Sequence, residues 1–358
     1  MSTPETFGAY LVYEKLGTGG MASVHRAQRA DGSGPPVALK RLHPQLAQVD
    51  EFVQAFLDEA KLALRLQHDN IARTFDVGRV DDTYFIAMEL VRGPTLSQLM
   101  NHCWSNKREF PLPISMYLVM QLLDALEYAH RLTDERGRPL GIIHRDVTPS
   151  NVIVSTAGVA KLIDFGIAKA ASSSVRTKTG FIKGKFAYVA PEYIAGKIDS
   201  RVDLFAAGIV AHELLAHRKL FQVDNDFETL KRVQSLAIEL PSKWSVRVPP
   251  AIDDVVMVAL RRDPDKRWQT AAEMRAALAH TVQKLPNAMQ VALWVNDTLG
   301  PTPRSDASAV SIEISLLEEG YKFADVDRDG KNRTRLALIL AGLFVIASAV
   351  VAYLIVAR

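Results

Sequence analysis

Cysteine is almost absent from this chain of 358 residues, which contains Cys103 alone. A single thiol excludes an intramolecular disulfide and a cysteine-rich zinc site, and it suits a reducing compartment. Long runs of basic residues are also missing, because 43 lysines and arginines nearly balance 40 acidic residues and leave a formal net charge of +3. The chain therefore lacks the basic stretch that nucleic-acid binding as a main activity would require.

Glycine and proline are too scarce for a low-complexity chain, at 20 and 17 residues. The first eight residues are polar and do not show the basic-then-apolar order of a secretory signal. What the chain does have is 48% hydrophobic and 23% charged residues, which is typical of globular proteins. Because one hydrophobic core rarely grows beyond about 250–300 residues, we expect two lobes or domains.

One long hydrophobic run is present, from Leu336 to Val356. It is uncharged and has roughly the twenty residues that a helix needs to cross about 30 Å of hydrocarbon. A buried core helix is the alternative, but the run has no polar face. Lys331, Arg333 and Arg335 precede it. We therefore expect a single-pass helix in the inner, cytoplasmic membrane, with most of the chain on the cytoplasmic side.

The patterns of hydrophobic residues change along the chain. Residues 10–92 read mostly as short strands, with one helix over residues 52–64. From residue 93 the spacing becomes helical, with helices expected at 114–132, 202–216, 252–260 and 271–285. The sequence therefore predicts an α+β protein with a small β-rich lobe at 10–92 and a larger helical lobe at 93–285. Residues 1–9 read as an N-terminal extension, 286–335 as a linker and 336–356 as the membrane helix.

Oxygen-bearing side chains gather around the stretch 142–151. Asp146 and Asn151 lie on one expected loop, and Asp164 follows a second apolar stretch. Hard oxygen ligands with a proton acceptor are what metal-assisted phosphoryl transfer requires. The simpler alternative is that Asp and Asn occur on ordinary turns.

Other motifs occur in a fixed order around this stretch. The set is Gly17-Thr18-Gly19-Gly20, Val37-Ala38-Leu39-Lys40, Glu59, His144-Arg145-Asp146 with Asn151, Asp164-Phe165-Gly166, and Ala190-Pro191-Glu192. This combination resembles the eukaryotic-like protein kinases, and the Gly-Gly-Met-Ala turn resembles the bacterial, Hanks-type serine/threonine branch. The resemblance runs from about Tyr10 to Leu285. It implies a two-lobed kinase fold that uses ATP with Mg²⁺, or Mn²⁺ in its place, to phosphorylate proteins.

The resemblance also implies roles for single residues. Lys40 would neutralise the α- and β-phosphates, and Glu59 would hold Lys40 in place. Asn151 and Asp164 would bind Mg²⁺, and Asp146 would accept or orient the proton of the substrate hydroxyl. Around the nucleotide, Gly17 and Gly19 would let the backbone approach the phosphates. The adenine would lie between Leu16, Val24, Ala38 and Ile153, Met88 would guard the pocket, and the backbone of Glu89 and Val91 would pair with the edge of the base. For each apolar member, plain core packing is the alternative.

Two further expectations concern folding more than chemistry. The resemblance implies an ion pair between Glu192 and Arg267. It also makes Asp203 the helix carboxylate that anchors the backbone of the catalytic loop. Because neither group would touch substrate, their loss should affect folding first.

Three positions depart from the family pattern. Ala22 replaces the third glycine of the turn. Thr148 stands where serine/threonine kinases usually carry lysine, and Lys185 stands where they usually carry threonine. We hypothesise a reciprocal exchange, in which Lys185 supplies the ammonium that stabilises the transferring phosphate and Thr148 supplies the hydroxyl. The alternative is that Lys185 points to solvent, as most lysines do.

The segment between Asp164 and Glu192 is polar and includes Thr177 and Thr179. Arg145 could receive a phosphate from either threonine, which would order the segment through charge-assisted hydrogen bonds. The two threonines also resemble the autophosphorylation sites of the bacterial family. A solvated loop with incidental hydroxyls is the alternative.

The sequence therefore predicts a membrane-anchored serine/threonine protein kinase in signalling, which phosphorylates itself and protein substrates. A homodimer held through the membrane helix would favour phosphorylation in trans. The alternative function is a membrane-tethered pseudokinase that acts as a nucleotide-binding scaffold. Thr148 and Ala22 keep that alternative open.

Overall fold

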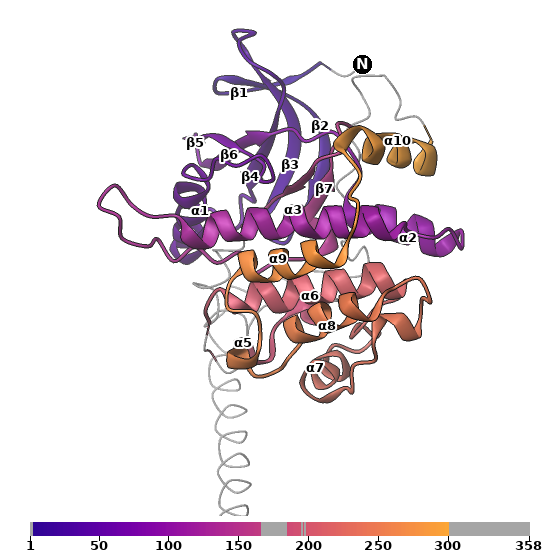
Figure 1. Ribbon diagram of the computed structural model, residues 1–358. Helices are drawn as coiled ribbons and strands as arrows, with labels where there is room; N and C mark the ends of the chain where they lie inside the picture. The colour runs from indigo at the N-terminus through magenta and orange to yellow at the C-terminus, as the bar shows by residue number, and fades with distance from the viewer. Residues whose placement is uncertain (1–2, 166–184, 195, 197, 301–358) are drawn as a thin grey trace, which may run out of the picture. The chain divides into compact units, whose positions relative to one another are not determined.

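The computed structural model describes residues 3–165, 185–194, 196 and 198–300 (Figure 1). Within this part, strands dominate up to residue 89 and helices dominate afterwards. This arrangement confirms the predicted two-lobed organisation, with a β-rich N-terminal lobe and a helical C-terminal lobe.

The N-terminal lobe is built on a six-stranded antiparallel sheet in the order β1-β2-β3-β4-β6-β5. Its strands are β1 (Glu5–Phe7), β2 (Tyr10–Thr18), β3 (Ala22–Arg29), β4 (Val37–Leu42), β5 (Thr74–Val80) and β6 (Thr83–Glu89). Strand β1 falls in the expected extension 1–9 and pairs with β2. Its three residues bury only Phe7, so the sequence had too little alternation to reveal it.

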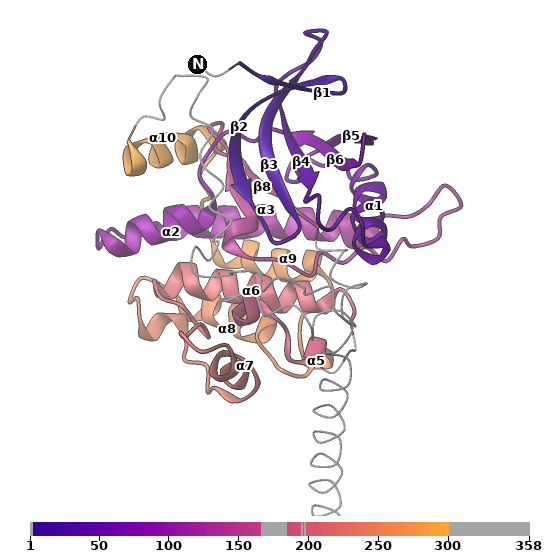
Figure 2. The ribbon, with the colours of Figure 1, turned by 180° about the vertical axis from the view of Figure 1, so that it is seen from behind.

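Helix α1 (Asp50–Ala63) packs against this sheet (Figure 2). Acidic residues begin it and Lys61 lies in its last turn, an order that suits the helix dipole. Its buried face contributes Val53, Phe56 and Ala60 to an apolar cluster with residues of the sheet. Glu59 lies on the same buried face, so the helix presents this carboxylate inward.

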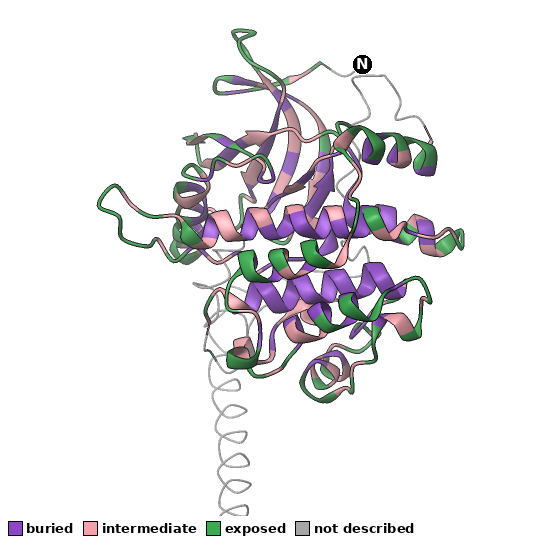
Figure 3. Cartoon of the chain, in the orientation of Figure 1, coloured by how far each residue is buried: buried purple, intermediate pink, exposed green. Residues whose placement is uncertain are grey.

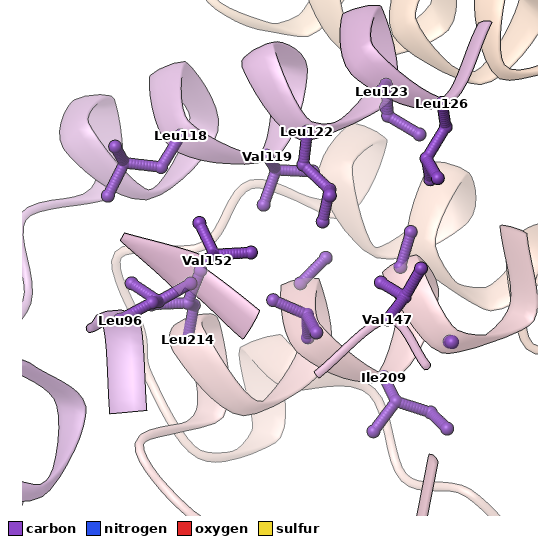
Figure 4. Packing of buried hydrophobic residues seen from close by; sticks show 14 of the residues in the cluster. Leu96, Leu118, Val119, Leu122, Leu123, Leu126, Val147, Val152, Ile209 and Leu214 are labelled. Atoms are coloured by element: carbon purple, nitrogen blue, oxygen red, sulfur yellow. The ribbon is translucent and has the colours of Figure 1, made fainter. Parts of the chain in front are cut away.

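The C-terminal lobe surrounds two buried helices, α3 (Leu112–Arg131) and α6 (Arg201–Ala216) (Figure 3). The remaining elements are α2 (Leu96–Ser105), the hairpin β7 (Val152–Val154) and β8 (Ala160–Leu162), α5 (Pro191–Ile194), α7 (Asp226–Ser235), α8 (Pro250–Ala259), α9 (Ala271–Thr281) and α10 (Ala288–Leu299). In Figure 4 the side chains of α3 face those of α6, with Val147 and Val152 among them. The buried side chain of Val147 thus fixes the loop that carries Asp146 to the hydrophobic core.

Helix α10 occupies the first part of the segment expected to be a linker. Val291 and Val295 are buried in the main hydrophobic cluster. The Trp294 ring lies 4.6 Å from the Phe110 ring, centroid to centroid. Where the backbone of Gly158 passes the start of α10, an added Cβ would lie 1.8 Å from the oxygen of Ala288. Residues 288–299 were expected to be linker but form a helix. The apolar side chains of this short stretch pack against other segments, and the sequence alone does not show that those segments lie nearby.

No helix in the described ranges has both the length and the hydrophobicity to cross a membrane. The predicted membrane helix 336–356 and the linker beyond residue 300 lie outside those ranges.

Candidate active site

The loop from Ile142 to Asn151 is the last part of the connection between α3 and β7, and Asp203 of α6 anchors it. The Asp203 carboxylate, 1% exposed, accepts hydrogen bonds from the backbone N–H groups of His144 at 2.7 Å and Arg145 at 2.8 Å. The ring of His130 bonds the same carboxylate at 2.8 Å. Arg145 has a φ of 62°, a left-handed conformation that these contacts hold in place. The predicted anchoring role of Asp203 is confirmed.

The electrostatics of Asp203 follow from these donors. Burial by itself would raise the pKa of the Asp203 carboxyl, but the hydrogen bond and charge of His130, with the groups of His144, outweigh it. The pKa is therefore lowered. The loop is tied to a buried, ionised carboxylate.

His144 links the two acidic parts of the site. Its Nδ1 accepts from the backbone N–H of Asp146 at 3.2 Å, and its Nε2 donates to the carbonyl of Ile163 at 3.1 Å. Its ring lies 4.5 Å from the ring of Phe165, centroid to centroid. Because Ile163 and Phe165 flank Asp164, His144 holds the stretch that carries Asp164 against the stretch that carries Asp146.

Asn151 is oriented by the same loop. Its Nδ2 donates to the backbone oxygen of Asp146 at 2.8 Å. Since the amide nitrogen is engaged in this bond, the carboxamide oxygen is the atom with which Asn151 would bind a cation. Asp146 itself is 9% exposed.

Lys40, Glu59 and Asp164 come together from β4, α1 and the segment after β8. The Lys40 Nζ lies 2.8 Å from Glu59 Oε1 and 3.0 Å from Asp164 Oδ1. Burial by itself lowers the pKa of the Lys40 ammonium, but the charges of Asp164 and Glu59 outweigh it and the pKa is raised well above its ordinary value. Lys40 is therefore a permanent cation at neutral pH.

The donors present fit a magnesium ion. Asn151 and Asp164 offer carboxamide and carboxylate oxygens, and Mg²⁺ commonly takes one or two protein oxygens, with phosphates and waters as its other ligands. Across the described part of the chain no group of three or more His, Cys, Asp or Glu side chains could hold a metal by itself.

Most of the apolar residues predicted to contact adenine are buried. Leu16, Val24 and Ala38 form one buried cluster, and Met88 and Leu90 pack against it. Ile153 is buried, at 4% exposure. The sequence analysis did not include Leu90. Its position between Glu89 and Val91, whose backbone was predicted to pair with the base, could have indicated that it lies near the same residues.

The end of β6 and the residues after it carry the two backbone groups predicted to pair with the base. In this structure they bond each other, because the Val91 N–H donates to the Glu89 carbonyl at 3.1 Å. The Glu89 carboxylate accepts from Lys161 at 2.9 Å, which fixes this segment to β8. This segment thereby lies beside the apolar cluster against which Leu90 packs.

The glycine-rich turn is closed by a bond from the Gly19 N–H to the Ala22 carbonyl at 2.7 Å. Gly17 is paired with Val24. Ala22, the residue in place of the third glycine, is 4% exposed and belongs to the apolar cluster of Leu42 and Phe56. Its methyl group therefore contributes to packing between the sheet and α1.

Of the two residues in the proposed exchange, the structure describes the side chain of Thr148 but not that of Lys185. Thr148 is 7% exposed, and its carbonyl accepts from the Asn151 N–H at 3.0 Å. Lys185 begins the short 3-10 helix η2 (Lys185–Tyr188), but its side chain lies outside the described residues, as do Thr177 and Thr179. The exchange and the two phosphorylation sites remain predictions.

A buried network that the sequence reading missed supports η2. The Tyr188 hydroxyl donates to Glu213 Oε2 at 2.7 Å, and Lys219 donates to the Tyr188 oxygen at 2.9 Å. Burial, and then the charge of Glu213, raises the pKa of Tyr188 well above its ordinary value. Glu213 lies among the apolar residues of α6, and this acidic residue in an apolar stretch was the sign in the sequence that could have indicated the network. The network joins the segment after Lys185 to the core helix.

The predicted pair between Glu192 and Arg267 is confirmed. Arg267 makes two bonds to the carboxylate, at 2.5 and 2.7 Å, and its side chain is 0% exposed. The same guanidinium donates to the carbonyls of Arg262 and Arg201. It therefore ties α5 to the loop before α9.

Comparison with known proteins agrees with this geometry. The family described as "Protein kinase domain" matches residues 10–282. The chain is 35% identical over 277 residues to the tyrosine-protein kinase MasK of Myxococcus xanthus, which covers 76% of this chain and 43% of that protein. It is 34% identical over 272 residues to the serine/threonine-protein kinase PrkC of Bacillus subtilis, which covers 75% of this chain and 40% of that protein.

Among solved structures, the crystal structure of the PknI kinase domain of Mycobacterium tuberculosis is similar, with a TM-score of 0.60 and 28% sequence identity. The similarity covers 79% of this chain and 100% of that one. The chain spans about two fifths of the length of the curated relatives above, at 43% and 40%. By its matched family and its relatives, this chain belongs to the protein kinase domain family.

Proposed function

We propose that this chain is an ATP-dependent protein kinase that transfers the γ-phosphate to serine or threonine hydroxyls of proteins. The observation that carries the proposal is the contact of Lys40 with both Glu59 and Asp164. His144 holds the stretch of Asp164 against the loop of Asp146. An ammonium shared between two carboxylates perturbs the pKa values of the group, and such groups cluster at functional sites.

Each residue has a task in this reaction. Lys40 offsets the negative charge of the phosphates, and Glu59 keeps its ammonium in place. Asp146 orients the acceptor hydroxyl and takes its proton. Asn151 and Asp164 would hold Mg²⁺, which supplies further positive charge when bound. Because Lys40 stays protonated, its contribution does not depend on pH near neutrality.

The test is incorporation of labelled phosphate from ATP into the protein itself and into a generic protein substrate. Asp146→Asn should lower the rate by about 10²–10⁴-fold, the usual contribution of a positioned base. Asp82→Asn, at a carboxylate whose side chain is 95% exposed, is the matched control and should be unaffected. Nucleotide binding by wild type without any transfer would instead establish the pseudokinase scaffold.

Tyrosine is a second acceptor to be tested, because one relative is named a tyrosine-protein kinase. Other relatives, including PrkC and the PknL of Mycobacterium tuberculosis, are named serine/threonine kinases. Acid hydrolysis of the autophosphorylated protein separates the three phosphoamino acids. Phosphotyrosine without phosphoserine or phosphothreonine would replace the serine/threonine assignment.

The exchange of Thr148 and Lys185 belongs to the same proposal. Thr148 is buried two residues after Asp146, and Lys185 begins η2, whose Tyr188 is tied to the core. Lys185→Ala should lower turnover strongly, and the double swap Thr148→Lys with Lys185→Thr should recover it. Near-normal turnover in Lys185→Ala would reject the exchange.

Autophosphorylation of Thr177 or Thr179 is also part of the proposal. Its support is the Arg145 side chain, whose Nε is buried and has no hydrogen-bond partner within the described part of the chain. A guanidinium in this position can receive a phosphate. Phosphopeptide mapping should find phosphate on one of these threonines, and phosphate on other segments only would reject the assignment.

We also propose that the apolar run 336–356 holds the protein at the inner membrane, with the kinase domain on the cytoplasmic side and in a homodimer suited to trans-phosphorylation. The support is its hydropathy, its length and the cations before it.

A further inference from the structure

His43 connects the glycine-rich turn to the strand that carries Lys40. It follows the end of β4 and lies three residues after Lys40. Its Nε2 lies 2.8 Å from the carbonyl oxygen of Gly19, a residue 24 positions away. Its backbone N–H donates to the carbonyl of Met21 at 2.9 Å. One residue thus bonds the turn through both its side chain and its backbone.

The chemistry of this contact determines which atom donates. A carbonyl oxygen only accepts, so the His43 Nε2 must carry the proton. The Gly19 N–H is already engaged with Ala22. Both backbone groups of Gly19 are therefore satisfied, in a turn whose two adjacent glycines would otherwise be highly mobile.

His43 also bonds the segment that leads to α1. Its carbonyl accepts from the N–H groups of Leu46 at 2.9 Å and Ala47 at 3.1 Å. These two side chains and Met21 pack against the cluster that contains Phe56 of α1. His43 therefore lies where the turn above the phosphates meets the segment leading to the helix of Glu59.

We infer that His43 is a positioning residue for nucleotide binding, which holds the glycine-rich turn in the conformation that covers the phosphates. The inference rests on the proposed function only in that the turn binds ATP. It predicts a loss of nucleotide affinity with little change in the transfer step, because His43 contacts the turn and not the reacting groups. A role confined to the bend before α1 would leave nucleotide affinity unchanged.

The experiment compares His43→Ala, His43→Gln and the control His25→Ala in the full chain. His25 lies in the neighbouring strand β3, and its Nε2 bonds the Ser23 hydroxyl at 3.1 Å rather than the Gly19 carbonyl. The affinity for a fluorescent ADP with Mg²⁺ and the KM and kcat for ATP are measured. His43→Ala should weaken ADP binding and raise KM by about threefold to tenfold, the range expected for one hydrogen bond, with kcat within about twofold.

His43→Gln should recover most of the affinity, because its amide can donate at the position of Nε2. Unchanged affinity in a folded His43→Ala, no recovery with Gln, or a fall in kcat alone would overturn the inference. Because ADP binding needs no turnover, an inactive wild type would refute the proposed function and leave this comparison intact.

A measurement on the wild type guards against a variant that does not fold. Long-range nitrogen NMR of the histidine rings should show the His43 proton on Nε2. A proton on Nδ1 alone would contradict the bond to Gly19 and overturn the inference.

Discussion

At the scale of single residues, the site depends on charges that are buried and paired. Lys40 and Arg267 are buried and paired with carboxylates. The buried Asp203 carboxylate is held by hydrogen bonds from His130 and the loop backbone. Removing one member of such a pair is costly because it leaves the other charge buried without compensation. Exposed ion pairs contribute little, since water and salt screen them.

Arg267→Met should therefore destabilise the protein by about 3–5 kcal/mol, the usual cost of breaking a buried pair. The measurement is urea unfolding followed by circular dichroism. Lys61→Met is the control, because Lys61 and Asp58 form a pair whose side chains are 70% and 58% exposed. That variant should change stability by less than about 0.5 kcal/mol. Equal losses in the two variants would show that the Glu192 pair is not structural.

Asp203→Asn should show a loss of stability that depends on pH. The folded-state pKa of Asp203 is lowered, so its ionised form stabilises the protein above the unfolded pKa of about 3.9. This stabilisation is lost as pH falls through the folded-state pKa. The difference between wild type and variant should be full at about pH 5 and should shrink below about pH 4. The measurement is the urea midpoint of wild type and variant at each pH. A stability difference that grows on acidification would contradict the prediction.

At the scale of elements, two helices present residues to the site from opposite lobes. Helix α1 turns Glu59 toward β4, and α6 supports the catalytic loop through Asp203. Helix α10 extends the folded unit past the predicted boundary at 285. Its contact with Gly158 is close enough that no side chain fits between them.

Gly158→Ala should displace α10, and Gly137→Ala is the matched control. Both glycines have nearly the same left-handed φ, 78° and 77°, so both variants incur the same backbone strain of about 1–2 kcal/mol. Only at Gly158 would the new Cβ meet backbone, the oxygen of Ala288. We expect an additional loss of about 1–3 kcal/mol in Gly158→Ala, with faster hydrogen exchange in residues 288–299. Equal losses in both variants would mean that α10 does not pack there.

At the scale of the whole molecule, the folded kinase domain is followed by a segment of different character. The apolar run 336–356 has no charge, whereas the residues 325–335 before it are polar and carry charges of both signs. If that run spans the membrane, the domain works at a surface, where its concentration relative to other membrane proteins is raised.

Removal of the residues after Thr334 should release the protein from the membrane. Full-length protein should stay in the membrane pellet after a carbonate wash, and the truncated protein should appear in the supernatant. Phe344→Arg is a point variant that should weaken insertion by about 2.5–3.5 kcal/mol without shortening the chain. Retention of both variants in the pellet would refute the anchor.

The order of the motifs along the sequence, through its resemblance to the eukaryotic-like protein kinases, predicted the two-lobed fold and named Lys40, Asp146, Asn151 and Asp164 as candidates. Such motifs are recognisable because the chemistry at each position requires a particular residue type. The alternation of residues in β4 and the periodicity of α3 and α6 predicted the main elements for the same reason, since one buried face imposes its spacing on the sequence. Only the boundaries of these elements differ, by a few residues.

The tertiary structure decided which distant residues meet. Lys40 and Asp164 are 124 positions apart, and no local pattern states that Asp164 shares the ammonium of Lys40 with Glu59. The packing of α10, the network of Tyr188 with Glu213, and the bond from His43 to Gly19 likewise depend on surfaces formed by other segments. Sequence patterns record the burial of one face of an element, but the partner of that face exists only once the chain is folded.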